Sequence, residues 1–107
     1  MGLNQNKKKN SLASIDKNIQ SLRKKIRRLD NKLVNLVSQR MLLTDQIGKS
    51  KKQADYPVRN IALEKQMLKD RAAWGKKMKL QPQFIKSLFR LLISYSVVRQ
   101  QMIIRGR

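Results

Sequence analysis

Five polar residues occupy positions where the helical pattern of this sequence predicts apolar ones. They are Arg40, Lys51, Glu64, Ser96 and Gln100. A buried, unpaired cation costs several kcal/mol, so two cations on packing faces need an anionic partner, and a bound ligand would supply one. If the faces converge, they enclose a pocket with two cations, one acid and two neutral hydrogen-bonding groups.

The apolar spacing that these residues interrupt is helical. From Ile15 onward, apolar residues recur at alternating intervals of three and four, which is typical of one face of a long helix. This apolar stripe comprises Ile15, Ile19, Leu22, Ile26, Leu29, Leu33 and Leu36, and its next positions are Arg40, Leu43, Ile47 and Lys51. Glu64 lies between Ile61 and Leu68 on a second face, and a third face reads Leu88, Leu92, Ser96, Gln100, Ile104.

Three helices, long, shorter and long, follow from this pattern, and the fold class is all-α. The first helix is predicted to begin near Ser14, whose hydroxyl can cap it, and to run to about residue 53. Pro57 marks a break and opens a second helix that ends near Gly75. Pro82 opens the third helix, which runs to about residue 104. Residues 1–13 are predicted to be a disordered basic tail, and 14–107 one helical domain.

The predicted first helix is too long for a compact monomer. About 39 residues at 1.5 Å each give roughly 58 Å, against a radius of gyration near 13 Å for a domain of this size. The simplest remedy is a dimer, in which the long helix of each chain packs along the other.

Composition excludes most catalytic chemistries. The chain of 107 residues has no cysteine and no histidine, so disulfides, thiolate nucleophiles, imidazole bases and the usual zinc or haem ligand sets are excluded. Its six acidic residues are too scattered to predict a metal site or a paired-carboxylate hydrolase. We therefore expect no metal site, and any chemistry must depend on charge placement and hydrogen bonding.

The formal charge of +20 predicts attraction of anions to nearly every face, including non-specific binding of polyanions. No apolar run reaches the roughly 18 residues of a membrane span, and no apolar signal core follows the basic start. We therefore expect a cytoplasmic protein without a membrane partner.

Several segments together resemble the all-helical bacterial chorismate mutases, in particular the mutase domain fused to prephenate dehydratase. They follow one another without an obvious gap from about Ile19 to Met102. They are Leu22-Arg23-Lys24-Lys25-Ile26, Leu29-Asp30, Gln39-Arg40, Ile47-Gly48-Lys49-Ser50-Lys51, Pro57-Val58-Arg59, Leu63-Glu64, Phe84 to Phe89, and Ser96-Val97 with Gln100-Gln101.

The resemblance implies an intertwined dimer that rearranges chorismate to prephenate without a cofactor or covalent intermediate. Carried over by position, Arg40 binds one substrate carboxylate, and Arg23 of the other protomer binds the second. Lys51 and Gln100 donate to the ether oxygen, Glu64 accepts from the ring hydroxyl, and Ser96 supports a carboxylate. Lys51, Gln100, Arg40 and Glu64 are thus the expected catalytic residues.

Two positions depart from the pattern of the family. Asn60 and Leu63 stand where its bacterial members usually have an aspartate and an arginine, which indicates loss of an ion pair bordering the site. Asn60 is still counted among the substrate-binding residues. Because isochorismate pyruvate lyases and aminodeoxychorismate mutases use the same architecture, a different substrate is an alternative.

Other interpretations remain open for the separate residues and for the chain. Arg40 can extend past a helix edge to water, Lys51 can be a solvated lysine, and Glu64 can pair with Lys65 or Lys69. Ser96 can bond to its own helix backbone, and Gln100 can face water. For the chain, the alternatives are a basic nucleic-acid-binding protein, supported by the Arg and Lys residues from 24 to 32, and a non-catalytic scaffold.

Overall fold

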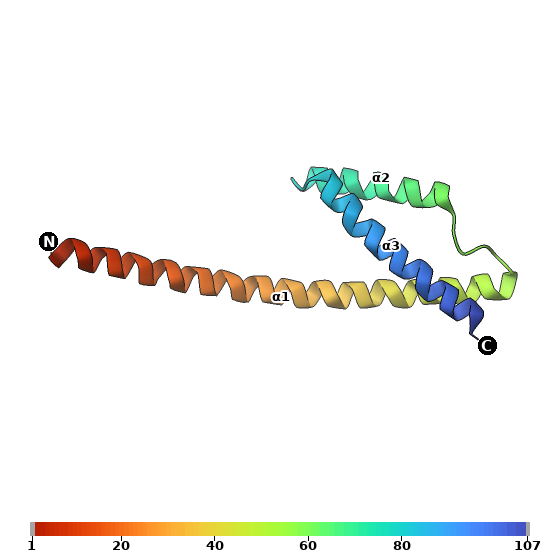
Figure 1. Cartoon of the computed structure of the whole chain (residues 1–107), viewed down its shortest axis with the longest axis horizontal. Helices are drawn as coiled ribbons and strands as arrows, with labels where there is room; N and C mark the ends of the chain where they lie inside the picture. Colours follow the sequence, from red (N-terminus) through yellow and green to blue (C-terminus); the bar gives the residue numbers. More distant parts are fainter. Residues whose placement is uncertain (1, 107) are drawn as a thin grey trace. The chain divides into compact units, whose positions relative to one another are not determined.

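The computed structural model describes residues 2–106, with side chains from residue 11 onward, and these residues form three helices (Figure 1). α1 spans Gly2–Ala54, α2 spans Ile61–Lys77 and α3 spans Pro82–Arg105. No strand occurs within this described part of the chain. The predicted all-α fold class with three helices is confirmed.

The observed helix boundaries differ from the predicted ones mainly at the start of α1. This helix begins at Gly2, so the predicted start at Ser14 is wrong. Residues 3–13 contain no proline or glycine, so nothing in this stretch stops the helix from extending toward the N-terminus. The side chains of residues 1–10 lie outside the described set, and the division into a disordered tail, 1–13, and a domain, 14–107, stays a prediction.

α2 begins at Ile61 because Asn60 caps it. Asn60 has an extended backbone, with φ −130 and ψ 97, and its side-chain oxygen accepts a hydrogen bond from the backbone N–H of Leu63 at 3.1 Å. This contact satisfies one of the free N–H groups of the first helical turn. The second helix was predicted to begin at Pro57, and this prediction is wrong. Residues 57–60 belong to the connecting loop.

The loop between α1 and α2 begins with a left-handed residue. Asp55 has a φ of 53, and the backbone N–H of Tyr56 then donates to the carbonyl of Lys51 at 2.9 Å. Aspartate tolerates this conformation better than most residues, and the arrangement resembles a helix C-terminal motif. Pro57 follows at once and keeps Tyr56 out of helical geometry.

The chain divides into two compact units, Met1–Gln39 and Arg40–Arg107, with the boundary inside α1. In the second unit, α2 runs beside α3, and α3 crosses the last turns of α1 (Figure 1). Its buried apolar core is small: Met41, Ala72, Ile85 and Ile93. Arg99 of α3 forms a bidentate ion pair with Asp45 of α1, and these hydrogen bonds hold the pKa of Asp45 below its usual value.

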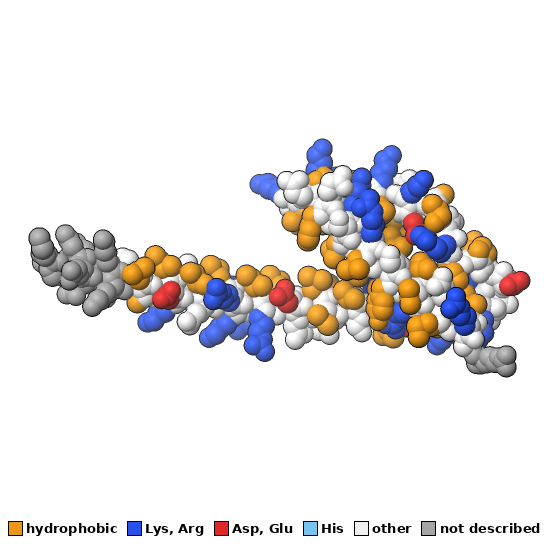
Figure 2. All heavy atoms as spheres, in the orientation of Figure 1, with side chains coloured by type: hydrophobic (Ala, Val, Ile, Leu, Met, Phe, Trp, Pro, Cys, Tyr) orange, Lys and Arg blue, Asp and Glu red, His pale blue; other side chains and the backbone are white. Residues whose placement is uncertain are grey.

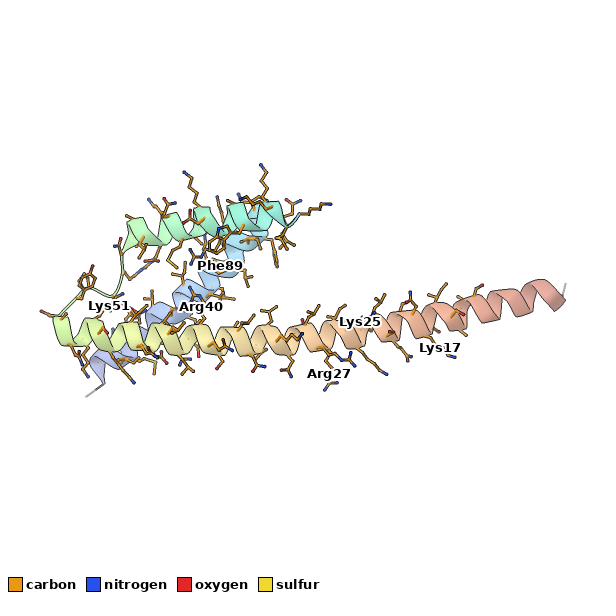
Figure 3. The ribbon with its side chains drawn as sticks, turned by 180° about the vertical axis from the view of Figure 1, so that it is seen from behind. Lys17, Lys25, Arg27, Arg40, Lys51 and Phe89 are labelled. Carbon is orange, nitrogen blue, oxygen red and sulfur yellow. The ribbon has the colours of Figure 1, made fainter. Side chains whose placement is uncertain are left out.

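The first unit is a helical segment with two unlike sides. Its apolar stripe is exposed, from 38% for Ile19 to 61% for Leu36. Figure 2 shows this stripe along one edge of α1 and Lys and Arg side chains along the other, where Figure 3 labels Lys17 and Arg27. No helix in the described part of the chain is both long and apolar enough to cross a membrane.

We predict that Gly75→Ala destabilises the protein. A Cβ at Gly75 would lie 2.4 Å from Cγ1 of Ile85, which is buried on α3. Overpacking of this kind costs about 1–3 kcal/mol, which outweighs the roughly 1 kcal/mol that alanine adds to helix propensity. Urea denaturation followed by circular dichroism measures the change.

The Ile85→Ala background is the control for this prediction, because it removes the Cγ1 atom. In that background Gly75→Ala should be neutral or stabilising. An equal loss of stability in both backgrounds would contradict close packing of α2 against α3 at this point.

Candidate functional site

A cavity of about 230 Å³ in the unit Arg40–Arg107 brings the five interrupting residues together. α1 contributes Arg40 and Lys51, α2 contributes Glu64, and α3 contributes Ser96 and Gln100. Figure 3 labels Arg40 and Lys51 on the same stretch of α1. The remaining lining residues are Thr44, Ile47, Tyr56, Val58, Asn60, Leu63, Met67, Ile93 and Val97. The three apolar faces therefore converge, and their polar members share one cavity.

Arg40 is held in the cavity by Ser96. Its Nη1 donates to the Ser96 hydroxyl at 2.8 Å, and that hydroxyl donates to the carbonyl of Leu92 at 2.8 Å. Ser96 is only 5% exposed, so it serves both its own helix and the arginine. Burial lowers the pKa of Arg40, and the positive charge of Arg71 lowers it further. Both effects disfavour the charged form of Arg40. An anion bound beside it would favour that charged form and would itself be attracted to it.

Lys51 links α1 to the loop between α1 and α2 and to α3. Its ammonium donates to the carbonyl of Val58 in the loop at 2.6 Å and to Oε1 of Gln100 on α3 at 3.0 Å. Gln100 is 6% exposed, so it does not face water. An ammonium has three N–H donors, and these two contacts leave one for a ligand. Because Gln100 accepts through Oε1, its amide N–H groups also remain to donate.

Gly48 allows α1 and α3 to approach closely enough for this pair to form. A Cβ at Gly48 would lie 3.1 Å from Cγ, 3.2 Å from Cα and 3.3 Å from Cβ of Gln100. These distances are tighter than ordinary van der Waals contact, so a side chain at residue 48 would require Gln100 or α1 to shift by a few tenths of an ångström. Glycine at this position thus sets the distance between Lys51 and Gln100.

Glu64 pairs with Arg59 of the loop, and not with Lys65 or Lys69. Arg59 donates to the two carboxylate oxygens at 2.8 and 3.2 Å, and these hydrogen bonds raise the pKa of Arg59. The Glu64 side chain is 17% exposed and that of Arg59 is 55% exposed. The carboxylate therefore lies at the cavity wall, and its counter-ion lies toward solvent.

Asn60 and Leu63 border the same cavity. The side-chain oxygen of Asn60 is engaged by the backbone N–H of Leu63, as part of the helix cap. Its amide nitrogen is the group left for a ligand, so the substrate-binding role of Asn60 stays a prediction. Leu63 adds an apolar side chain to this part of the wall.

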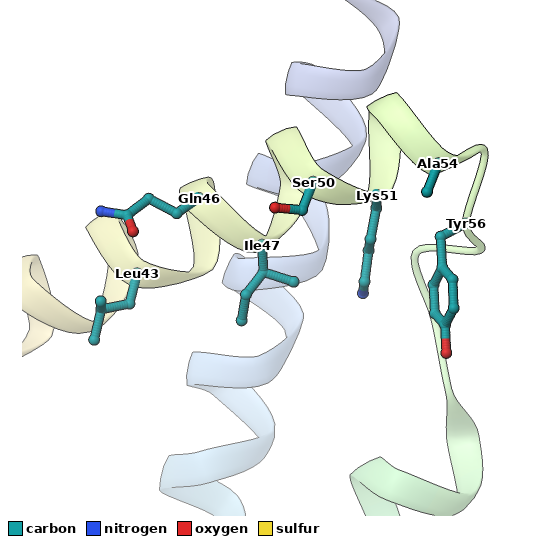
Figure 4. A pocket seen from close by; sticks show the side chains of 7 residues that line it. All are labelled: Leu43, Gln46, Ile47, Ser50, Lys51, Ala54 and Tyr56. Carbon is teal, nitrogen blue, oxygen red and sulfur yellow. The ribbon is translucent and has the colours of Figure 1, made fainter.

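An open hollow of about 690 Å³ adjoins the cavity and shares Ile47, Lys51 and Tyr56 with it. Leu43, Gln46, Ser50 and Ala54 complete its lining (Figure 4). Figure 4 shows the Lys51 and Tyr56 side chains side by side, pointing the same way. The cavity is thus bordered on the side of Lys51 and Tyr56 by an open and mostly apolar surface.

Arg23 lies in the unit Met1–Gln39 and is exposed there. Its predicted role stays a prediction. Sequence reasoning assigned no role to Thr44, Tyr56, Val58 or Arg59. A backbone carbonyl such as that of Val58 leaves no signal in a sequence, and Arg59 could have been found only by pairing it with Glu64, five residues on.

Comparisons with known proteins match these residues to one family. Residues 22–101 match the family model described as chorismate mutase type II. The chain is 38% identical over 85 residues to a bifunctional chorismate mutase/prephenate dehydratase of Escherichia coli strain K12, covering 79% of this chain and 22% of that relative.

Two further relatives carry the same name. Identity is 32% over 90 residues with the protein from Enterobacter agglomerans, covering 84% of this chain and 23% of the relative. It is 35% over 83 residues with the protein from Buchnera aphidicola of Acyrthosiphon pisum, covering 78% and 22%. The chain thus spans about a fifth of the length of the curated relatives it matches. For the E. coli relative the covered share is 22%.

Proposed function

The chain belongs to the chorismate mutase type II family, and on this premise we propose that it rearranges chorismate to prephenate. One observation carries the proposal: two cations, a carboxylate and two hydrogen-bonding side chains line one cavity. Chorismate has two carboxylates, an ether oxygen and a ring hydroxyl. The cavity offers a cation for one carboxylate, donors for the ether oxygen and an acceptor for the ring hydroxyl. A second chain would supply the cation for the other carboxylate.

The reaction makes few chemical demands on the protein. One carbon–oxygen bond breaks as one carbon–carbon bond forms, and no proton is transferred, so no general acid or base is needed. The protein must hold a folded conformer of the substrate by its carboxylates. It must also place donors where negative charge grows on the ether oxygen.

In this mechanism Lys51 and Gln100 act on the ether oxygen. The free N–H of Lys51 and the amide N–H groups of Gln100 are the donors that their mutual hydrogen bond leaves available. Arg40, with Ser96 behind it, binds one carboxylate, and Glu64 accepts from the ring hydroxyl. No step requires a cofactor.

We expect Lys51→Ala to lower kcat by about 10² to 10³, because a preset donor to a developing oxyanion is typically worth that factor. Loss of chorismate absorbance, with prephenate identified by chromatography, measures the rate. Lys49→Ala is the matched control, since it removes an exposed lysine two positions away on the same helix and should leave the rate nearly unchanged.

Failure of the unaltered protein to convert chorismate would overturn the proposal. Isochorismate and aminodeoxychorismate are then the substrates to test, because Asn60 and Leu63 change the wall near Glu64. Failure with all three would leave a non-catalytic scaffold. The cytoplasmic location stays a prediction.

We propose further that the active form is an intertwined homodimer with sites shared between protomers. The exposed apolar stripe of α1 supports this proposal, because burying such a stripe against a second copy stabilises both chains. The open hollow beside Lys51 gives a second chain access to the cavity. Arg23 of the partner subunit would supply the cation for the second carboxylate.

A mixing experiment tests shared sites. Arg23→Ala and Arg40→Ala should each be nearly inactive alone. A mixed dimer combines one intact Arg40 with the intact Arg23 of its partner, so an equal mixture should regain about a quarter of full activity after subunit exchange. Regain of nothing, while capture through an affinity tag on one variant shows that mixed dimers form, would place both arginines in the site of one chain.

A second candidate function is polyanion binding by the basic side of α1. Lys24, Arg27, Arg28, Asn31 and Lys32 line a hollow of about 520 Å³ there. Phosphate backbones bind such surfaces with a strong dependence on salt. The protein should elute from heparin at a salt concentration that falls clearly when Arg27 and Arg28 are both changed to Gln. An unchanged elution would remove this surface from consideration.

A further inference from the structure

Glu64 lies between two hollows that differ in their other charges. On one side it lines the cavity that also holds Arg40 and Lys51. On the other side it lines a hollow of about 400 Å³ with Arg59, Lys65 and Arg90. Arg59 belongs only to this second hollow, so it approaches the carboxylate from outside the cavity.

The Glu64 carboxylate pairs with Arg59 outside the cavity and does not pair with Arg40 or Lys51 inside it. Among the residues that the structure describes, the ion pairs are Arg59 with Glu64 and Arg99 with Asp45. Neither Arg40 nor Lys51 pairs with Glu64, although all three share one cavity wall. Arg59 engages both oxygens of the carboxylate, and such a two-point contact fixes direction as well as distance.

We propose that Arg59 is a positioning residue that prevents Glu64 from neutralising the cations of the anion-binding cavity. A carboxylate released by loss of Arg59 would move toward the nearest cations in the partly buried cavity, because attraction between opposite charges is stronger there than in water. It would then compete with the carboxylates of the substrate. This inference rests on the proposed mutase function for its kinetic consequence and on geometry alone for its structural one.

The loop that carries Arg59 supports this role. Three consecutive loop residues each hold one part of the site: the carbonyl of Val58 accepts from Lys51, Arg59 pairs with Glu64, and Asn60 caps α2. The loop therefore holds the Lys51 ammonium of α1 and the Glu64 carboxylate of α2 through separate contacts. It keeps two opposite charges of one cavity apart.

The kinetic test is a cycle of four proteins: unaltered, Arg59→Ala, Glu64→Gln, and both changes together. We expect Arg59→Ala alone to raise the KM for chorismate ~10-fold, the size of effect typical of coupled neighbours. In the Glu64→Gln background the same change should alter KM less than about twofold, because no carboxylate remains to compete. An equal effect in both backgrounds would overturn the proposal.

Two controls separate this role from loss of charge or of structure. Arg90→Ala removes a cation from the same outer hollow without releasing Glu64, and should leave KM nearly unchanged. Arg59→Lys keeps a cation beside the carboxylate but loses the two-point contact, and should recover part of the affinity. If Arg90→Ala raises KM as much as Arg59→Ala does, general electrostatics explains the effect and the proposal fails.

The structural test does not depend on turnover. In a crystal structure of Arg59→Ala, we expect the Glu64 carboxylate to form an ion pair with Lys51 or Arg40. A carboxylate that stays in place or turns to solvent would overturn the inference. If the unaltered protein does not convert chorismate, the proposed function fails, and this structure still decides the role of Arg59.

Discussion

The site depends on the close approach of α1 and α3 at Gly48. With no side chain there, the backbone of Gln100 lies against α1, and the Gln100 amide reaches Lys51 one turn further along. The ion pair of Arg99 with Asp45 and the hydrogen bond of Arg40 to Ser96 join the same two helices at positions that precede Gly48 and Gln100.

A polar cavity in so small a unit is tolerated because most of its charges already have protein partners. Lys51 is held by a carbonyl and an amide, Arg40 by a hydroxyl, and Glu64 by an arginine. The two cations that face the cavity have neutral partners, so their charge is not cancelled. This arrangement leaves the cavity able to attract an anion, and the unit does not need a bound anion to satisfy its buried charges.

The helix pattern predicted the contents of the cavity better than it predicted the ends of the helices. Interruptions of the apolar spacing identified Arg40, Lys51, Glu64, Ser96 and Gln100, because a polar residue at a packing position must be satisfied inside the fold. The start of α1 was misplaced, since Ser14 is a suitable cap but the preceding residues are compatible with a helix too. The start of α2 was placed too early, because Pro57 and Asn60 are both good starting signals and the cap at Asn60 prevailed.

The sequence alone determined the helical class, the polar side chains of the site and the lack of any thiol or imidazole chemistry, since residue type and spacing decide all three. Only the tertiary structure decided which partner each polar group takes. Glu64 had lysines nearby on its own helix and pairs instead with Arg59, and Lys51 binds a backbone carbonyl that no sequence pattern marks. Spacing along one helix says which residues share a face, whereas pairing across helices depends on how the loop and the crossing point bring those faces together.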